Sequence, residues 1–237
     1  MGSALKMLFP PRCPACRRVM EDTGIYIHPE CRGKFRLIVP PRCFKCGRTV
    51  AETEDICAEC RRKRHMYDWG LALYDYDDTA KLAMVDYKGT GIRRNGEFFA
   101  TEAAKRLGGL LKKFRPEVLV PVPISDRKLG ERGFNQSEHI AEIVGEMLGM
   151  PVDDDVLFRK KSKVDQKKLS AKERLNNADF GFWTVEDMPY KRICLVDDVY
   201  TTGSTLDACT RVLKEAGARE VGFLVMFSGI PVVSEYN

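Results

Sequence analysis

The chain has 237 residues, of which 44% are hydrophobic and 31% are charged, and its formal net charge is +5. This composition is typical of a soluble globular protein with one large core and a small accessory unit. No stretch approaches the roughly 20 apolar residues of a membrane-spanning helix. The first ten residues contain one Lys and a short apolar patch, which does not make a signal peptide. We therefore expect a cytoplasmic protein.

The positive charge is concentrated in the first quarter of the chain. Residues 1–65 contain 14 Lys and Arg against 7 Asp and Glu, whereas residues 66–237 contain 25 against 27. Such a bias is typical of proteins that meet acidic partners such as nucleic acid. A basic face that is only solvated is an equally good interpretation, so the charge leaves both readings open.

Seven of the nine cysteines lie between positions 13 and 60, in a segment that is repeated. Pro10-Pro11-Arg12-Cys13 recurs thirty residues later as Pro40-Pro41-Arg42-Cys43. His28-Pro29-Glu30-Cys31 aligns with Cys57-Ala58-Glu59-Cys60, so His28 takes the place of a cysteine. Each copy therefore offers four soft metal ligands.

Two turns of the C-x-x-C type per copy give the four ligands that tetrahedral Zn²⁺ prefers. A closed site of four protein ligands is structural, and each copy is too small to fold without its metal. Disulfides fit poorly with a reducing compartment, and an iron–sulfur cluster is the other open reading. Sequential sharing of the ligands is simplest, although a cross-braced arrangement stays open. The sequential sets are Cys13, Cys16, His28 and Cys31, and Cys43, Cys46, Cys57 and Cys60.

Strands and helices alternate after residue 65. Apolar patterns predict helices over 79–88, 96–114, 137–148 and 206–216, and strands over 69–76, 117–122, 156–158, 180–185, 193–196 and 220–227. The alternation predicts an α/β fold, with a mainly parallel sheet and helices on both of its faces. We divide the chain into a small cysteine-rich, tandem zinc-ribbon-like head, 1–65, and a body, 66–237. Ligands of the body should bind beyond the carboxyl ends of its strands.

The most specific pattern runs from Arg192 to Leu206. Four apolar residues precede Asp197 and Asp198, and a run of small hydroxyl-bearing residues and glycine follows. Such a run before a helix presents backbone N–H groups to a phosphate. Paired carboxylates suit sugar hydroxyls or hydrated Mg²⁺. An ordinary capped turn is the alternative. The run consists of Thr201, Thr202, Gly203, Ser204 and Thr205.

This stretch resembles the phosphoribosyl pyrophosphate (PRPP) motif of type I phosphoribosyltransferases. Val120-Pro121-Val122-Pro123, Glu131-Arg132-Gly133-Phe134-Asn135-Gln136 and the cysteine-rich head narrow the resemblance to the ComF (ComFC-like) family of competence proteins. The resemblance covers essentially the whole chain. One departure is His28, where many relatives have cysteine. Further residues that match the spaced pattern of the family are Gln166, Leu169, Arg174, Asn177 and Phe180.

The resemblance implies a type I phosphoribosyltransferase-like body that binds PRPP with Mg²⁺. The run Thr201–Thr205 would bind the 5′-phosphate, and Asp197 and Asp198 would bind the ribose hydroxyls directly or through Mg²⁺. A turn and three cations would face the pyrophosphate: Pro123, Ile124 and Ser125, with Arg127, Lys128 and Arg132. The residues expected to act in catalysis are Asp197, Asp198, Lys128 and Arg132.

The charged run 159–168 contains five lysines and few apolar residues. It could be a lid over the phosphates, a solvated loop or a nucleic-acid contact.

Two functions of different classes follow. The first is an enzyme, a pentosyl-transferring glycosyltransferase that moves a phosphoribosyl group to a nucleobase-like or nucleotide-like acceptor, linked to DNA uptake in natural competence. The second is a non-catalytic adaptor that binds PRPP or single-stranded DNA and docks a helicase-like competence partner through its zinc head. The complete motif favours the enzyme. The basic head favours the adaptor, although the head lacks the interleaved aromatic residues of a base-stacking surface.

Overall fold

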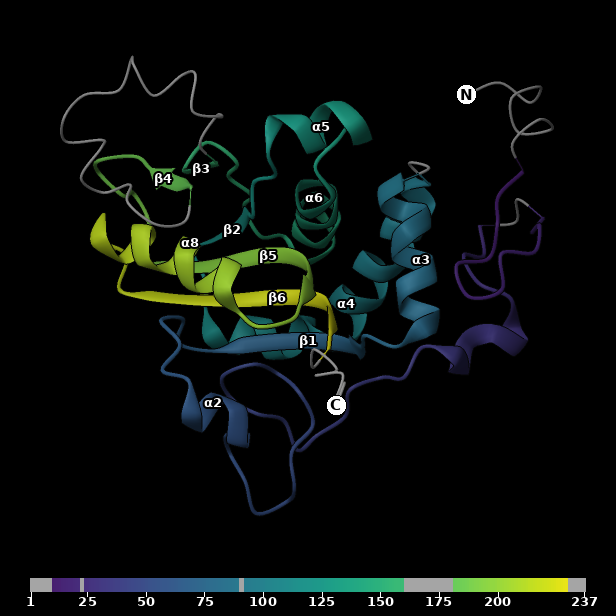
Figure 1. Cartoon of the computed structure of the whole chain (residues 1–237), viewed down its shortest axis with the longest axis horizontal. Helices are drawn as coiled ribbons and strands as arrows, with labels where there is room; N and C mark the ends of the chain where they lie inside the picture. The colour runs from purple at the N-terminus through teal and green to yellow at the C-terminus, as the bar shows by residue number, and fades with distance from the viewer. Residues whose placement is uncertain (1–9, 22–23, 90–91, 160–180, 230–237) are drawn as a thin grey trace, which may run out of the picture.

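The computed structural model describes residues 10–21, 24–89, 92–159 and 181–229 (Figure 1). Its centre is a four-stranded sheet in the order β1-β6-β5-β2, with every neighbouring pair parallel. The strands are β1 (Gly70–Asp75), β2 (Val118–Pro121), β5 (Arg192–Tyr200) and β6 (Glu220–Ser228). The predicted parallel α/β architecture is confirmed.

Helices cover both faces of this sheet, which buries the strands on both sides and explains their nearly continuous apolar sequences. One face packs on α4 (Arg93–Phe114) and α6 (Gln136–Leu148), whose buried side chains include Phe99 and Ile140. The opposite face packs on α8 (Ser204–Glu215) through residues such as Leu213. Helix α3 (Asp78–Gly89) follows β1 and packs against α4.

In the described part of the chain, a second sheet consists of the short antiparallel strands β3 (Leu157–Arg159) and β4 (Phe182–Thr184). Both strands are predicted from the sequence, but they pair with each other, with β4 next to α8, and do not join the parallel sheet. Their rings Phe158 and Trp183 stack at 4.2 Å between centroids. Residues 160–180 lie outside the described part of the chain. They include most of the charged run 159–168, which is one candidate for a lid. They also include the residues that match the spaced family pattern, Gln166, Leu169, Arg174, Asn177 and Phe180.

The strand β5 is longer than predicted. The sequence suggested an end at Val196, before the acidic pair. The structure continues the strand because Asp197 pairs with Val225 and Tyr200 pairs with Ser228 of the equally long β6. The acidic pair therefore lies within the second half of the strand, toward the carboxyl edge of the sheet.

The segment after β2, expected to be a loop up to α6, contains the short helix α5 (Asp126–Arg132). The hydroxyl of Ser125 caps this helix by accepting a hydrogen bond from the Lys128 N–H at 3.4 Å, and Gly133 ends it with φ at +75°. The helix buries none of its residues, so it has no apolar periodicity to reveal it.

The two cysteine-rich copies lie on different sides of the body (Figure 1). We call residues 10–34 the first ribbon, which includes the 3₁₀ helix η1 (Pro29–Lys34), and residues 40–63 the second ribbon, which includes α2 (Ala58–Arg62). The first ribbon places Cys31 in the core on the α4 face, and the second ribbon places Cys46 in the core on the α8 face. Both ribbons are thus integral to the packing of the body.

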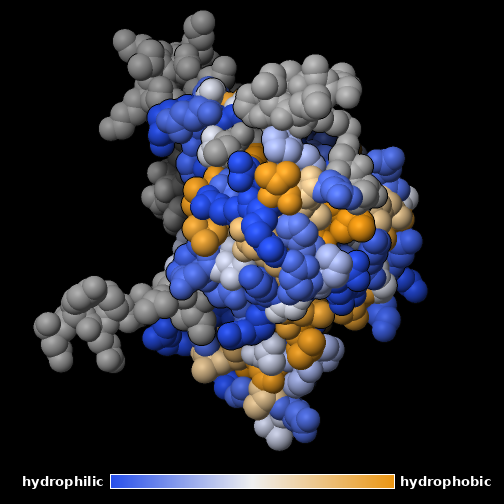
Figure 2. Space-filling view, turned by 90° about the vertical axis from the view of Figure 1, so that its right-hand side faces the viewer, coloured by the Kyte–Doolittle hydropathy of each residue, from blue (hydrophilic) through white to orange (hydrophobic). Residues whose placement is uncertain are grey.

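The side of the molecule that carries α3 and the first ribbon is mostly hydrophilic, with small, separate hydrophobic patches (Figure 2). Between the ribbon and the helices, Arg17 binds Asp86 of α3 through its Nε at 2.8 Å, and Arg94 of α4 donates to the Ile25 carbonyl at 2.6 Å. Among the described residues, no helix is both long and apolar enough to span a membrane.

Candidate functional site

Each carboxylate of the acidic pair is held by a different helix. Asp198 is buried, and its Oδ2 lies 2.8 Å from the Nζ of Lys88 at the end of α3. The Oδ1 of Asp197 accepts hydrogen bonds from the Ser137 hydroxyl in the first turn of α6 and from the Asp198 N–H, both at 2.9 Å. Helices α3 and α6 therefore fix the two carboxylates at the carboxyl edge of the sheet.

Burial, and then the charge of Asp198, raise the pKa of Asp197 to about 7. The hydrogen bond from the Asp198 N–H, the charge of Lys88 and the Ser137 hydroxyl oppose this rise without cancelling it. Ionisation of Asp197 at neutral pH therefore lowers the stability of the folded protein. A ligand that brings hydroxyl donors or a cation to this carboxylate would remove part of that cost.

This shift predicts how stability changes with pH. The folded protein retains the Asp197 proton up to about pH 7, whereas the unfolded chain loses it near the ordinary value of 3.8. Stability contributed by this group therefore falls as the pH rises between these two values. The variant Asp197→Asn should become progressively more stable than the wild type from about pH 4 to about pH 7, and the difference should level off above that, in magnesium-free urea titrations.

The exposed Asp154→Asn is the matched control for that titration. Asp154 lies outside the site, so its difference from the wild type should stay nearly constant over the same pH range. A parallel trend in the two variants would show that Asp197 is not the group responsible.

The hydroxyl-rich run forms a bend followed at once by the first turn of α8. We call residues 201–205 the phosphate loop. Gly203 has φ at +80°, and a Cβ built on it would lie 2.9 Å from Cε1 of His65 and 3.0 Å from the hydroxyl oxygens of Tyr67 and Tyr200. Only glycine fits this conformation and this space. Thr201, Ser204 and Thr205 are exposed at the start of α8, where a helix has free backbone amides to offer a phosphate. Within the loop, the Ser204 N–H donates to the Thr202 hydroxyl at 3.4 Å.

A polar cluster beneath the phosphate loop fixes it to the junction that follows the second ribbon. The Nδ1 of His65 lies 2.7 Å from Oδ2 of Asp207 in α8, and its ring stacks on Tyr67 at 4.7 Å. The hydroxyls of Tyr67 and Tyr200 are 2.8 Å apart. The basic junction 61–65 ends in these fixed contacts.

Four cationic side chains form a group around Lys128, and one of them, Lys88, binds Asp198 of the acidic pair. Burial, and then the neighbouring positive charges, lower the pKa of the Lys128 ammonium. Charges that repel one another in this way favour a bound polyanion. Between α3 and α5 lies an open pocket of about 440 Å³, lined by Lys88 and Arg132. The four cations are Lys88, Lys128, Arg132 and Arg159.

The remaining predicted residues fall into two positions. Pro123, Ile124 and Ser125 form the half-buried turn between β2 and α5, at the same edge of the sheet as the acidic pair. Arg127 is not brought toward the pair: its side chain is 73% exposed and binds Glu131 one helical turn away at 2.6 Å.

Sequence reasoning missed two residues of the site, Lys88 and Ser137. Lys88 is the penultimate residue of α3 and has the pattern of an ordinary solvated helix end. Ser137 follows the cap Asn135, whose side chain accepts a hydrogen bond from the Ser137 N–H at 3.1 Å, so its sequence position indicates a helix start only. Neither position carries a local signal, because the contacts depend on how α3 and α6 pack against β5.

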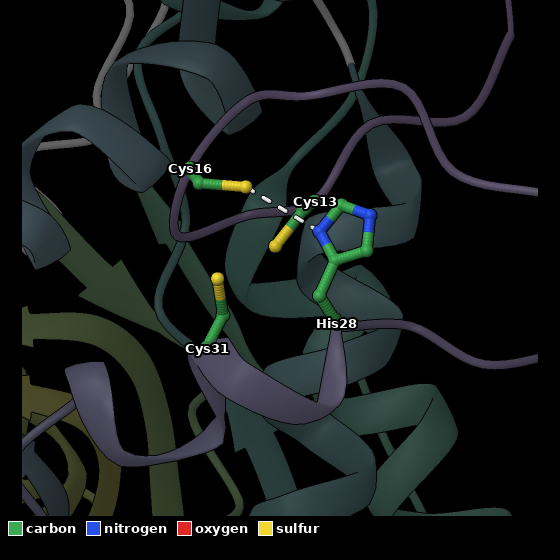
Figure 3. Close-up of side chains that lie close together, drawn as sticks. All are labelled: Cys13, Cys16, His28 and Cys31. Atoms are coloured by element: carbon green, nitrogen blue, oxygen red, sulfur yellow. Dashed lines mark hydrogen bonds between the residues drawn. The ribbon is translucent and has the colours of Figure 1, made fainter.

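The eight predicted metal ligands form two groups, and the ligand atoms of each group lie within 4.8 Å of one another. Cys13, Cys16, His28 and Cys31 point toward a common centre (Figure 3). Cys43, Cys46, Cys57 and Cys60 form the other group. The ligands are therefore shared sequentially and not in the cross-braced arrangement. The first group has three thiols and an imidazole, and the second has four thiols. Both sets of ligands fit tetrahedral Zn²⁺.

The position of His28 predicts that it is a ligand of the first metal site. Its Nδ1 lies 3.4 Å from the Sγ of Cys16, on the side of the ring that faces the thiols. We expect His28→Cys to retain two zinc ions per chain and His28→Ala to lose one, measured by atomic absorption after gel filtration. His139→Ala, which changes a histidine outside both groups, should retain two. Two ions in His28→Ala would exclude His28 as a ligand.

Comparison with known proteins identifies the family. The model of the phosphoribosyl transferase domain matches residues 90–230. The chain belongs to this family. The model of the double zinc ribbon domain matches residues 4–61 and 35–68, over both cysteine groups. The zinc-ribbon character of the first quarter is thus supported by a second, independent comparison.

Several relatives of this phosphoribosyl transferase domain protein are named for competence or DNA utilization. Competence protein F of Haemophilus influenzae is 35% identical over 109 residues, 45% of this chain and 48% of the relative. Competence protein ComFC of Streptococcus pneumoniae is 30% identical over 152 residues, 63% of this chain and 64% of the relative. DNA utilization protein YhgH of Salmonella typhi is 29% identical over 171 residues, 70% of this chain and 74% of the relative.

The matched region thus spans about half of the first relative and under two thirds of the second. The resemblance to the ComF family predicted from the sequence is confirmed by these names.

Proposed function

We propose that this protein binds PRPP at the carboxyl edge of the sheet and transfers its phosphoribosyl group to a nucleobase-like or nucleotide-like acceptor. The observation that carries the proposal is the acidic pair near the end of β5, two residues before the phosphate loop and next to the group of four cations around Lys128. The family match over residues 90–230 supports it. Reduced, metal-binding cysteines fit a cytoplasmic location.

Each part of PRPP has a complementary group in this arrangement. The amides and hydroxyls of the phosphate loop would bind the 5′-phosphate. Asp197 and Asp198 would bind the ribose hydroxyls, or hold Mg²⁺, which suits carboxylate oxygens and would neutralise charge on the pyrophosphate when bound. The turn Pro123–Ser125 would present its backbone to the pyrophosphate, next to the cations of α3, α5 and β3.

The reaction needs little covalent chemistry from the protein. A nitrogen nucleophile attacks the anomeric carbon while the bond to pyrophosphate breaks, and positive charge develops on the ribose ring. The protein would act by orienting the ribose through Asp197 and Asp198, and by stabilising the leaving pyrophosphate through Lys128 and Arg132. Lys88 would release Asp198 and turn toward the phosphates when the ligand enters.

Calorimetric titration of PRPP into the zinc-loaded protein, with Mg²⁺ present, tests the binding step. We expect saturable binding of one PRPP per chain. Release of pyrophosphate with a panel of nucleobases, nucleotides and single-stranded DNA then tests turnover. Absence of binding would contradict the proposed site, and binding without release from any acceptor would contradict the transfer.

A second candidate function is supported by the basic composition of residues 1–65 and by the relatives named for competence and DNA utilization. In this function the protein is an adaptor that binds single-stranded DNA and a helicase-like competence partner through its ribbons, with PRPP as a bound regulator. Fluorescence anisotropy with a labelled single strand should then show binding that weakens steeply as salt is raised. Absent or salt-insensitive binding would contradict it.

A further inference from the structure

The internal duplication gives each ribbon an equivalent arginine. Arg18 and Arg48 both follow the first C-x-x-C turn of their copy by two residues. Each binds the glutamate of its own second ligand turn: Arg18 binds Glu30 at 2.5 Å, and Arg48 binds Glu59 at 2.9 Å. The Arg18 pair is exposed, with 64% and 59% of the side chains accessible, whereas the Arg48 pair is nearly buried, with 11% and 20%.

The difference arises because Arg48 has further partners on the body. Its Nη2 donates to the carbonyl oxygen of Thr201 at 3.0 Å and to that of Gly229 at 2.8 Å, and its Nε donates to the Ser228 hydroxyl at 3.0 Å. The guanidinium also lies over the ring of Tyr200, 5.2 Å from its centroid. One arginine of the second ribbon thus joins the carboxyl ends of β5 and β6 where the phosphate loop begins.

The metal-binding turn of the second ribbon determines where Arg48 points. The Arg48 carbonyl accepts a hydrogen bond from the Cys43 N–H at 2.7 Å, and Cys43 accepts one from the Gly47 N–H at 2.8 Å. Gly47 has φ at +74°, and a Cβ on it would lie 2.6 Å from the backbone nitrogen of Ala72 in β1. The turn is therefore pressed against the sheet, with its arginine directed at the loop.

We propose that Arg48 is a positioning residue for the phosphate loop, through which the second ribbon, folded around its metal, sets the affinity for PRPP. The inference rests on the proposed PRPP site. Thr201 is the first residue of the loop, and its carbonyl is held only as long as the ribbon keeps its fold. Metal binding in the second ribbon and PRPP binding are then coupled, and the coupling acts equally in both directions.

The first test compares Arg48→Met with Arg18→Met, which removes the equivalent arginine and the equivalent glutamate pair but no contact to the loop. Arg48→Met should weaken PRPP binding about tenfold or more in calorimetry, whereas Arg18→Met should bind within about twofold of the wild type. Arg48→Lys should recover part of the loss. Unchanged PRPP affinity in an Arg48→Met protein that retains two zinc ions would overturn the proposal.

The second test uses the wild-type protein and covers the case in which Arg48→Met does not fold. The zinc affinity is measured by equilibrium competition with a chromogenic chelator, with and without saturating PRPP. Reciprocal coupling predicts that PRPP raises the affinity for one of the two ions about tenfold and leaves the other unchanged. Equal zinc affinities of both sites with and without PRPP would overturn the proposal.

A wild-type protein that fails to bind PRPP would contradict the proposed function without testing the role of Arg48. Hydrogen exchange of the amides at 201–206 provides that test without any ligand. These amides should exchange faster in Arg48→Met than in Arg18→Met, because only the first variant releases the Thr201 carbonyl. Equal rates in the two variants would overturn the positioning role.

Discussion

Replacing both carboxylates at the end of β5 by amides, in Asp197→Asn/Asp198→Asn, is expected to abolish measurable PRPP binding. Each hydrogen bond to a charged group contributes about 1.5–3 kcal/mol. Loss of two such bonds therefore weakens binding at least about a hundredfold, since about 1.4 kcal/mol corresponds to a factor of ten. Removal of the charge that would hold Mg²⁺ adds to the effect. Calorimetry with Mg²⁺ and PRPP measures it directly.

Asp154→Asn/Asp155→Asn is the matched control for this variant. These residues are also adjacent aspartates, but both are exposed and lie in the segment between α6 and β3. The control should bind PRPP as the wild type does. The site variant should remain folded, because its two amides occupy the same volume and Asp197 no longer has to ionise in a buried position. Wild-type affinity in a folded site variant would place the PRPP site elsewhere.

The sequence predicted most of the body because its signals are local. The apolar run before Asp197, the hydroxyl-rich residues after Asp198 and the glycine at 203 each have a local physical reason, and all three lie in one strand-turn-helix unit. The partners of the carboxylates could not be predicted in this way. Lys88 is 110 residues from Asp198, and Ser137 is 60 residues from Asp197.

In the cysteine-rich head too, the sequence predicts the local features and not the contacts with the body. The duplication revealed all eight ligands, because the spacing of C-x-x-C turns is a local property, but it left sequential and cross-braced sharing open until the structure showed the sequential groups. Arg18 and Arg48 occupy equivalent positions in the two copies, although of these two only Arg48 contacts the phosphate loop. The difference depends on which face of the sheet each ribbon covers, and that is decided by tertiary packing.

Loss of the second metal site is expected to be the most destabilising single change in the ribbons. Cys46 has no exposed surface and belongs to the core on the α8 face. Cys46→Ser removes one ligand from a group whose metal supplies folding free energy to the ribbon. It also leaves a hydroxyl in an apolar environment without its metal. We expect one zinc ion per chain and a loss of at least about 3 kcal/mol in the free energy of unfolding.

Cys209→Ala is the control for that measurement, because Cys209 is equally buried in α8 but lies outside both ligand groups. It should retain two zinc ions and lose about 1 kcal/mol or less in urea denaturation followed by circular dichroism. Because the second ribbon shares its core with α8 and β6, Cys46→Ser should weaken the whole body in one cooperative transition. Two separate transitions, with the body at wild-type stability, would instead show that the ribbon folds independently of the phosphate loop that it contacts.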